Sequence, residues 1–368
     1  MSREAAGLYV HVPFCLTRCG YCDFNTYAGL DHLKSGYVDA LAAEAEMWLD
    51  DWSGTSFVSV FFGGGTPTTL PAATLAHLLN AFRTWCELAS GAEITSEANP
   101  DTVDQPYLCA LLDGGVTRLS MGVQSFDPVV LESLERVHSP DSARRAFAAA
   151  RSAGFADVNL DLIYGANGES LRSWCRTLEE AVSLGPEHLS CYALTVEPST
   201  PLGRSVAAGL VPTPDADVQA EMYAATCEVL AGAGYEHYEV SNWATPGHRC
   251  IHNLGYWEGR PYVGIGAGAH SYRGGLRWWN VRPPAQYLEM VARGERPIGG
   301  EERLSDEDRR LERLLLGLRT ADGVPPEWVE PDRATEFVTA GLAERRNGRL
   351  SLTDRGMFLA NDVVLELG

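Results

Sequence analysis

The chain has 368 residues, a length typical of about two domains, and its 45% hydrophobic content is sufficient for ordinary globular cores. The formal net charge of −20 argues against nucleic-acid binding, which depends on cations that neutralise phosphates, and against docking on anionic lipid. No apolar run approaches the roughly 18 residues of a membrane span, and no apolar signal segment precedes the first predicted strand. We therefore expect a soluble, cytoplasmic protein without stable membrane insertion.

The first 200 residues alternate short apolar segments with amphipathic ones. The apolar segments predict strands at 8–12, 57–62, 92–97, 117–123, 157–163 and 188–196. The amphipathic segments predict helices at 35–50, 71–88, 104–113, 141–153 and 170–184, with Gly154 as a C-terminal cap. Six consecutive βα units predict an α/β fold with a partial, open (β/α)6 barrel over 1–200, short of the eight units of a closed barrel. Ligand sites in such folds gather at the C-terminal ends of the strands.

The pattern changes after residue 200. Residues 197–216 predict an irregular connection, followed by a helix at 215–233 and a strand near 235–240. A stretch rich in glycine and aromatic residues then occupies 241–282. We assign 201–299 to a connecting region.

The last part of the chain, 300–368, predicts a compact α+β domain of winged-helix-like type. Ser305 and the acids after it predict a helix N-terminus, a second helix lies near 332–342, and a final helix spans about 354–366. Asn347 and Gly348 predict a type I′ hairpin turn. The main cationic concentration of the chain lies here, as either solvated faces or a ligand or partner surface: Arg309, Arg310, Arg313, Arg345, Arg346 and Arg349.

Three cysteines, Cys15, Cys19 and Cys22, follow the first predicted strand in a CxxxCxxC run. Three thiolates this close together can hold one soft metal centre. Structural zinc normally takes four protein ligands, and no fourth thiolate follows. The spacing therefore favours an iron–sulfur cluster with one iron free for a small ligand. The alternative, buried thiols or disulfides, is disfavoured because the other cysteines are scattered and no secretory context is present.

The CxxxCxxC run and the FFGGGTP run at 61–67 resemble those of the radical S-adenosylmethionine (SAM) superfamily. The segments 9–15 and 22–24 are similar to the branch that contains oxygen-independent coproporphyrinogen III oxidase and the HemW-type haem chaperones. The resemblance implies that the cysteines hold a [4Fe-4S] cluster whose open iron binds SAM. Three glycines allow close backbone approach and offer N–H groups. By resemblance, Gly64, Gly65 and Thr66 grip the methionyl end of SAM.

Polar residues recur at the ends of the next strands. Glu97 and Gln124 close the third and fourth strands, and Asn159 and Asp161 share one face of the fifth. Each residue alone is explained equally well by a structural hydrogen bond, but the set at strand C-termini favours a ligand. The resemblance implies the following contacts to SAM: Glu97, Gln124, Arg136 and Asp161, with Tyr9 and Tyr21 flanking the cluster and SAM. The chain departs from the family at Glu135, usually glycine, and at 165–168, usually G-x-P-G.

Residues 252–257, HNLGYW, carry a second signal. Histidine is a good axial ligand for haem iron, Tyr256 and Trp257 offer flat apolar walls, and Asn253 could orient the imidazole. From the residues alone, a core histidine among packed aromatics is the simpler interpretation. The stretch is similar to the HNxxYW motif of the HemW-type chaperones, which implies that His252 contacts haem. The chain has no CxxCH motif for covalent haem attachment.

Three features favour the chaperone branch: the HNxxYW motif, Phe24 where the oxidase typically has a further cysteine, and a short segment before Cys15. The resemblance then implies a protein that binds haem, a [4Fe-4S] cluster and SAM and hands haem to an acceptor protein, with no catalytic residue assigned. It also admits a homodimer, although no residue requires one. The alternative is an oxygen-independent coproporphyrinogen III oxidase, which decarboxylates its substrate oxidatively by radical SAM chemistry. A third hypothesis, DNA binding through the winged helix, is disfavoured by the net charge, and an anionic porphyrin would need a local basic pocket.

Overall fold

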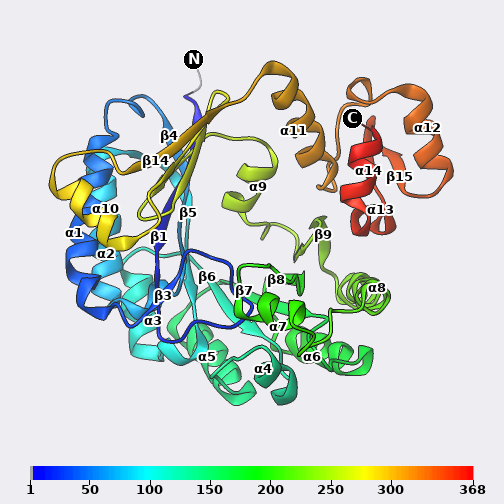
Figure 1. Ribbon diagram of the computed structural model, residues 1–368, viewed down its shortest axis with the longest axis horizontal. Helices are drawn as coiled ribbons and strands as arrows, with labels where there is room; N and C mark the ends of the chain where they lie inside the picture. Colours follow the sequence, from blue (N-terminus) through cyan, green and yellow to red (C-terminus); the bar gives the residue numbers. More distant parts are fainter. Residues whose placement is uncertain (1–2, 368) are drawn as a thin grey trace.

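Six parallel strands form the centre of the fold and follow one another across the sheet in chain order (Figure 1). The computed structural model describes residues 3–367. The six strands are β1 (Ala5–Val12), β4 (Ser56–Gly64), β5 (Glu87–Ala98), β6 (Arg118–Gln124), β7 (Asp157–Tyr164) and β8 (His188–Ala193). Each matches a strand that the sequence predicts. Both faces of these strands are covered, and for that reason their apolar residues are almost continuously buried, as at Leu8, Val10 and Val12.

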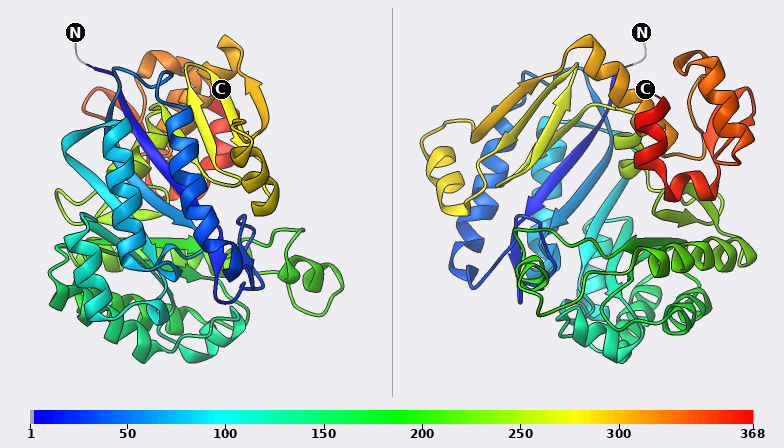
Figure 2. Two further views of the ribbon diagram at one scale, coloured as in Figure 1. Left: turned by 90° about the vertical axis from the view of Figure 1, so that its left-hand side faces the viewer. Right: turned by 45° about the vertical axis from the view of Figure 1, so that its right-hand side comes forward.

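The helices between these strands lie on the outer face of the curved sheet (Figure 2). The predicted ones are α1 (Lys34–Met47), α2 (Ala72–Trp85), α3 (Gln105–Asp113), α5 (Pro140–Ala153) and α6 (Leu171–Leu184). Helix α5 begins after Ser139, whose side chain accepts a hydrogen bond from the Ser142 N–H, and ends at Gly154 with φ of 102°. The predicted glycine cap is therefore confirmed, because φ in this range favours glycine.

The sheet continues beyond the six strands at both edges. At one edge β11 (Tyr262–Ile265) pairs in parallel with β1, and β12 (His270–Arg273), β13 (Leu276–Asn280) and β14 (Ile298–Arg303) follow antiparallel. At the other edge β10 (Asn242–Ala244) pairs antiparallel with β8, and β9 (Glu236–Glu239) pairs antiparallel with β10. Among the described residues β14 and β9 remain the two ends of the sheet, so the barrel is open, as predicted.

The stretch 201–299, expected as a connecting region, thus contributes strands to both edges of the same sheet. These strands have three to six residues, too short for a clear periodicity, and the two that join the six central strands, β11 and β10, pair with strands far along the chain. The stretch also contains α8 (Ala216–Gly232), α9 (Ile251–Trp257) and α10 (Pro284–Ala292).

Four helices were not predicted from the sequence: α4 (Pro128–Ser133), α7 (Pro201–Ala207), α9 and α10. Helix α7 lies inside the segment 197–216 that was expected to be irregular. The Thr200 side chain caps it by accepting a hydrogen bond from the Gly203 N–H, and Pro201 occupies its first position. A helix of seven residues with an internal glycine gives almost no periodic signal, and the expectation was wrong for this reason.

The C-terminal domain lies beside the β9 edge of the sheet (Figure 1). It comprises α11 (Asp306–Leu318), α12 (Pro331–Thr339), the hairpin β15 (Ala343–Arg346) and β16 (Arg349–Leu352), α13 (Asp354–Phe358) and α14 (Ala360–Leu367). The predicted Ser305 cap is present as a capping box with Asp308, and the predicted hairpin turn has positive φ at Asn347 and Gly348. The single predicted final helix is divided at Leu359.

Main-chain hydrogen bonds join this domain to the sheet. The Val240 N–H donates to the Arg319 carbonyl at 3.1 Å, and the Ala321 N–H donates to the Tyr238 carbonyl at 2.9 Å. The loop after α11 is therefore fixed against β9. Within residues 3–367, no helix combines the length and apolarity needed to cross a bilayer.

Candidate functional site

A cavity of about 530 Å³ opens at the C-terminal ends of the parallel strands. Eleven of the predicted site residues line it: Cys15, Cys19, Tyr21, Cys22, Gly64, Gly65, Thr66, Glu97, Gln124, Arg136 and Asp161. We call it the strand-end cavity. The structure therefore brings together residues from the cysteine loop and from the ends of four strands, as expected for parallel strands whose C-termini share one edge. Two predicted residues, Tyr9 and His252, do not line it.

The cysteine loop begins at β2 (Phe14–Cys15) and returns at β3 (Tyr27–Ala28). Each thiol has a polar neighbour. The Thr66 hydroxyl lies 3.8 Å from Cys15 Sγ, an Arg136 guanidinium nitrogen lies 3.5 Å from Cys19 Sγ, and the Thr26 hydroxyl lies 3.7 Å from Cys22 Sγ. Burial raises the pKa of the Cys15 thiol. Metal ligation requires the thiolate, so donors to sulfur and a bound metal would offset the cost of burying its charge.

The spacing of the three sulfurs tests whether they form a site for a single zinc ion. A zinc ion with Zn–S distances of about 2.3 Å would bring its sulfur ligands within about 4.6 Å of one another. In the described part of the chain, only Cys227, His237 and Asp354 bring three such ligand atoms within 4.8 Å. The sulfurs of Cys15, Cys19 and Cys22 therefore do not all lie within 4.8 Å of one another, so as placed they do not form a site for a single zinc ion.

The glycine loop packs directly against the cysteine loop. A Cβ on Gly65 would lie 2.7 Å from the Phe14 carbonyl oxygen, and a Cβ on Gly64 would lie 2.5 Å from the His11 ring. The Thr66 N–H donates to the Phe14 carbonyl and the Gly65 N–H donates to the Val12 carbonyl, both at 2.8 Å. The expectation that these amides are free for a ligand is therefore wrong. The glycines are required because two main-chain segments meet here, and the loop fixes Cys15 in position.

Gln124 and Glu135 both adopt left-handed backbone conformations, with φ of 66° and 53°. For Gln124 this conformation occurs at an irregularity of the β6–β7 pairing, where the side chain reaches the cavity. At Glu135 it explains why the family usually has glycine before Arg136. A Cβ on Gly20 would lie 2.7 Å from the Glu135 carboxylate, so this side chain lies against the cysteine loop.

Arg136 connects the cysteine loop to the sheet. One guanidinium nitrogen contacts Cys19 Sγ, and another donates to the Gly122 carbonyl at 2.8 Å. Tyr21 lies close to both Cys19 and Arg136, and burial raises its pKa. This arrangement holds a cation beside Cys19 Sγ, where it would stabilise the thiolate.

Glu97 and Asp161 supply two buried carboxyl groups to the cavity. Glu97 accepts a hydrogen bond from the Gly64 N–H at 3.0 Å, and Asp161 accepts from Ser120 at 3.0 Å and from Asn159 at 2.8 Å. Burial, and to a lesser extent the Asp161 charge, raises the pKa of Glu97 to about 8. Burial also raises the pKa of Asp161. Two acids with few donors lining a cavity are suited to a ligand that carries positive charge and hydroxyl groups.

Tyr9 lies one layer deeper than predicted. Its hydroxyl lies 2.9 Å from His11 Nδ1, and its ring packs against Phe61 with 6.2 Å between ring centroids. It lines a second cavity of about 140 Å³, which shares Glu97 and Asp161 with the strand-end cavity. Tyr9 therefore packs beneath the strand-end cavity and does not line it.

His252 is buried and both of its ring nitrogens are occupied. Nδ1 lies 2.9 Å from the Ser59 hydroxyl and Nε2 lies 2.9 Å from the Tyr256 hydroxyl. The ring stacks on Phe61 at 5.1 Å, and burial lowers its pKa to about 3. An axial bond to haem iron would require the loss of one hydrogen bond and the opening of the core. The geometry thus favours the simpler interpretation, a structural histidine, over the expected haem contact.

Sequence reasoning missed several residues that line the strand-end cavity, including Phe24, Ser120 and Tyr192. Phe24 and Tyr192 are large and exposed, at 64% and 43% of their full accessible area. Ser120 could have been predicted, because Arg118, Ser120 and Gly122 are two residues apart in β6 and therefore share the face that lines the cavities. Tyr192 follows no motif, and only the fold places it beside the cavity.

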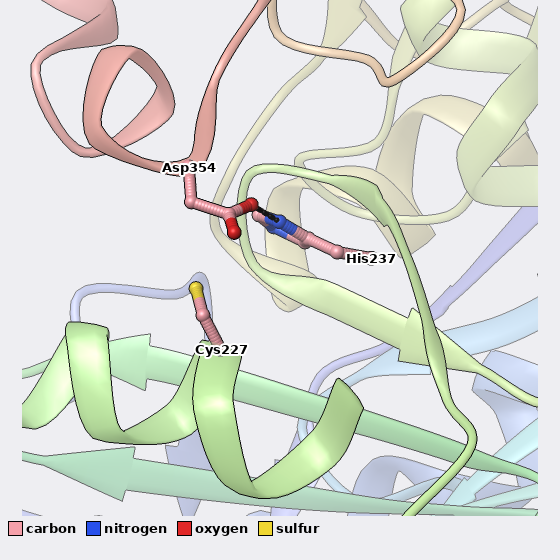
Figure 3. Close-up of side chains that lie close together, drawn as sticks. All are labelled: Cys227, His237 and Asp354. Atoms are coloured by element: carbon pink, nitrogen blue, oxygen red, sulfur yellow. Dashed lines mark hydrogen bonds and ion pairs between the residues drawn. The ribbon is translucent and has the colours of Figure 1, made fainter. Parts of the chain in front are cut away.

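A separate group of side chains connects α8, β9 and α13 (Figure 3). His237 Nδ1 lies 2.8 Å from the Asp354 carboxylate, and Cys227 lies close to both. The His237 ring stacks on Trp243 at 4.3 Å. Burial raises the pKa of Cys227 to about 12, so without a metal this thiol stays protonated. We interpret the pair of His237 and Asp354 as a tether between the barrel and the C-terminal domain.

Comparison with known proteins assigns the family. The model of the radical SAM superfamily matches residues 9–181, and that of the HemN C-terminal domain matches residues 304–359. A Mycobacterium tuberculosis protein named heme chaperone HemW is 43% identical over 373 residues, which cover 100% of this chain and 96% of the relative. The chain belongs to the HemW family.

Further matches agree with this family assignment. The heme chaperone HemW of Bacillus subtilis is 34% identical, with 96% of this chain and 97% of the relative covered. The solved structure of Escherichia coli coproporphyrinogen III oxidase, HemN, a radical SAM enzyme, superposes with a TM-score of 0.84 at 23% identity, covering 99% of this chain and 90% of that one. This likeness shows a shared fold. The predicted resemblance and the predicted fold class, a partial barrel with a C-terminal domain, are confirmed.

Proposed function

We propose that this protein is a haem chaperone that carries a [4Fe-4S] cluster and SAM, binds haem and transfers it to an acceptor protein. The observation that carries this proposal is the full-length similarity to relatives named heme chaperone HemW. The nine cysteines are all unpaired, which is consistent with the reducing compartment of the cytoplasm.

The strand-end cavity is the place for the cluster and SAM. Cys15, Cys19 and Cys22 would hold the cluster, and Arg136 and Thr66 would stabilise its thiolate sulfurs. When bound, such a cluster supplies one-electron chemistry and an open iron for SAM.

The polar groups around the cavity would hold SAM itself. Glu97 and Asp161 are suited to its positive charge and its ribose hydroxyls, and Gln124 reaches the cavity from the next strand end. Gly64, Gly65 and Thr66 contribute the surface on which SAM rests, since their amides are already bonded.

The alternative, a coproporphyrinogen III oxidase, fits the barrel interior less well. A reacting tetrapyrrole would have to lie beside SAM, inside the barrel. That space is filled by Tyr9, Phe61, His252 and Tyr256, which leave a cavity of about 140 Å³. Pockets for ligands of drug size occupy about 300–1,000 Å³. This inner cavity alone is therefore too small for a macrocycle.

Two assays on the same anaerobically reconstituted protein test the proposal. In the first, haem-loaded protein is mixed with an apo haem enzyme, and recovery of that enzyme's activity reports transfer. In the second, coproporphyrinogen III, SAM and a reductant are supplied and the decarboxylated product is measured. We expect haem transfer and no decarboxylation. Decarboxylation without transfer would contradict the proposal and favour the oxidase.

A further inference from the structure

A third cavity, of about 800 Å³, lies where helix α9 faces the C-terminal domain. Its walls come from α9, from α11 with the loop that follows it, and from the β15–β16 hairpin. We call it the interdomain cavity. It shares no lining residue with the strand-end cavity, so the proposed cluster and SAM do not account for it.

We propose that the interdomain cavity is the haem site of this protein, an inference that rests on the proposed function. Haem is a flat apolar macrocycle with two carboxylates on one edge. A site for it needs aromatic or apolar surface for the ring and cations for the carboxylates. The interdomain cavity has both, and its volume lies in the range of ligand pockets.

The aromatic surface consists of Trp257 and Trp328, one from each side of the cavity. Trp328 keeps 36% of its accessible area exposed to solvent, although tryptophan side chains are highly buried on average. The Trp257 indole nitrogen is buried and has no hydrogen-bond partner among the described residues. Leu254 adds apolar area next to Trp257 on α9.

The cations are four arginines, a concentration that stands out in a chain with a net charge of −20: Arg249, Arg313, Arg346 and Arg349. Within residues 3–367, Arg313, Arg346 and Arg349 have no carboxylate within 4.0 Å, and Arg349 donates only to the carbonyls of Asp322 and Gly323. Arg249 is paired with Glu236 at 3.1 Å and with Asp322 at 3.7 Å. Glu258, the other acid of the lining, is paired with Arg260. The guanidinium groups of Arg313 and Arg346 are therefore available for the carboxylates of a ligand, which they can bind in bidentate geometry, while Arg349 adds positive charge beside them.

Helix α9 explains how the HNxxYW motif relates to this site without an axial histidine. His252 and Tyr256, four residues apart, share the face that is buried in the barrel. Leu254 and Trp257, three residues apart, share the face that lines the interdomain cavity. The histidine therefore anchors the helix, and the tryptophan contacts the haem.

The lining residues include no histidine, cysteine, methionine or tyrosine, the usual axial ligands of haem iron. The site would therefore hold the porphyrin by its faces and edges and leave the iron free. An open iron suits transfer, because the acceptor can supply its own ligand before release.

The experiment is a haem titration of the full chain followed by absorbance, with two double variants that change the net charge equally. Arg313→Glu with Arg346→Glu alters the interdomain cavity. Arg310→Glu with Arg345→Glu is the matched control. Arg310 lies in α11, as Arg313 does, and Arg345 lies in β15, as Arg346 does. Both control arginines are exposed and do not line the cavity. We expect the cavity variant to lose about tenfold or more in affinity and the control to stay within about twofold. Metal-free protoporphyrin IX should compete with haem in the wild type.

Three outcomes would overturn the inference. Wild-type affinity in the cavity variant would place haem elsewhere and leave the proposed function intact. Equal losses in both variants would show an effect of overall charge, and failure of protoporphyrin IX to compete would show that binding depends on an iron ligand. A wild-type protein that binds no haem would instead remove the proposed function itself. Unfolding curves and cluster absorbance confirm that both variants are folded.

Discussion

The Tyr256 hydroxyl lies 2.9 Å from Nε2 of His252, one turn earlier in the same helix. With the Ser59 hydroxyl at 2.9 Å from Nδ1, this bond occupies the second ring nitrogen of a fully enclosed imidazole. A histidine in this setting stabilises the fold and is not free to bind iron. The most conspicuous residue of the motif thus anchors α9 against β4 and β1.

Replacing His252 by alanine should destabilise the protein and leave haem affinity nearly unchanged. The change creates a cavity and removes the partner of two buried hydroxyls, so we expect a loss of about 2–4 kcal/mol in the free energy of unfolding. Urea unfolding and haem titration measure the two effects. His32→Ala, at an exposed position, is the control. A selective loss of haem binding in a stable variant would restore His252 as a haem ligand.

The pKa of His252 gives this account a pH signature. In the folded protein the ring stays neutral down to a pKa of about 3, whereas the unfolded chain binds a proton near 6.5. Between these values the unfolded state binds more protons, so the free energy of unfolding falls as pH falls. His252→Gln should lack this part of the decline between pH 7 and pH 5.

SAM binding should strengthen as pH rises from 6 toward 8, because the pKa of Glu97 is raised to about 8. Below that value the carboxyl is protonated and cannot attract a cation, while SAM favours the carboxylate and should displace the proton. Calorimetry in buffers with different ionisation heats would detect that proton release. In Glu97→Gln the affinity should be weaker and nearly independent of pH. An unchanged pH dependence in this variant would remove Glu97 from the SAM site.

Cys19→Ala should abolish the broad visible absorption that a cluster gives after anaerobic reconstitution, because two thiolates cannot replace three. Cys86→Ala is the matched control, since Cys86 is also buried and does not line the strand-end cavity. Iron analysis and absorbance measure the result. Full absorption in the Cys19 variant would disprove the cluster assignment.

Asp354→Ala should loosen the contact between the C-terminal domain and the barrel. The hydrogen bond from His237 lowers the pKa of Asp354, but the carboxylate is 62% exposed, so the loss in stability should be about 1 kcal/mol or less. Limited proteolysis and the urea midpoint are the measurements. Asp362→Ala, in the exposed part of α14, should change neither, and equal effects in both variants would argue against a tether.

The six strands and five main helices could be predicted because their signals are local periodicities. The strand-end cavity was predictable too, since the cysteines and the residues at strand ends occupy positions that a parallel sheet brings to one edge. Contacts between distant segments could not be predicted. The partner of His252 on β4, Ser59, lies 193 residues away, and the Gly65 and Thr66 amides are bonded to main-chain carbonyls of another segment.

The interdomain cavity could not be predicted from the sequence, because it too is formed by segments that are far apart in the chain. Arg313 and Arg346 could be recognised as part of a cationic concentration, but both a solvated face and a ligand surface fitted the pattern. Only the position of the C-terminal domain against α9 places these arginines beside Trp257. The choice between the two interpretations depends on that packing.

The central claim is that this chain binds haem, and a titration of the wild-type protein tests it most directly. Haem is added to the reconstituted full chain and the absorbance is followed, with bovine serum albumin as a nonspecific comparison. We predict saturation at about one haem per chain with a submicromolar dissociation constant of roughly 0.1–1 μM, suited to transfer. Absorbance that rises without saturation, as for free haem in buffer, would contradict the account.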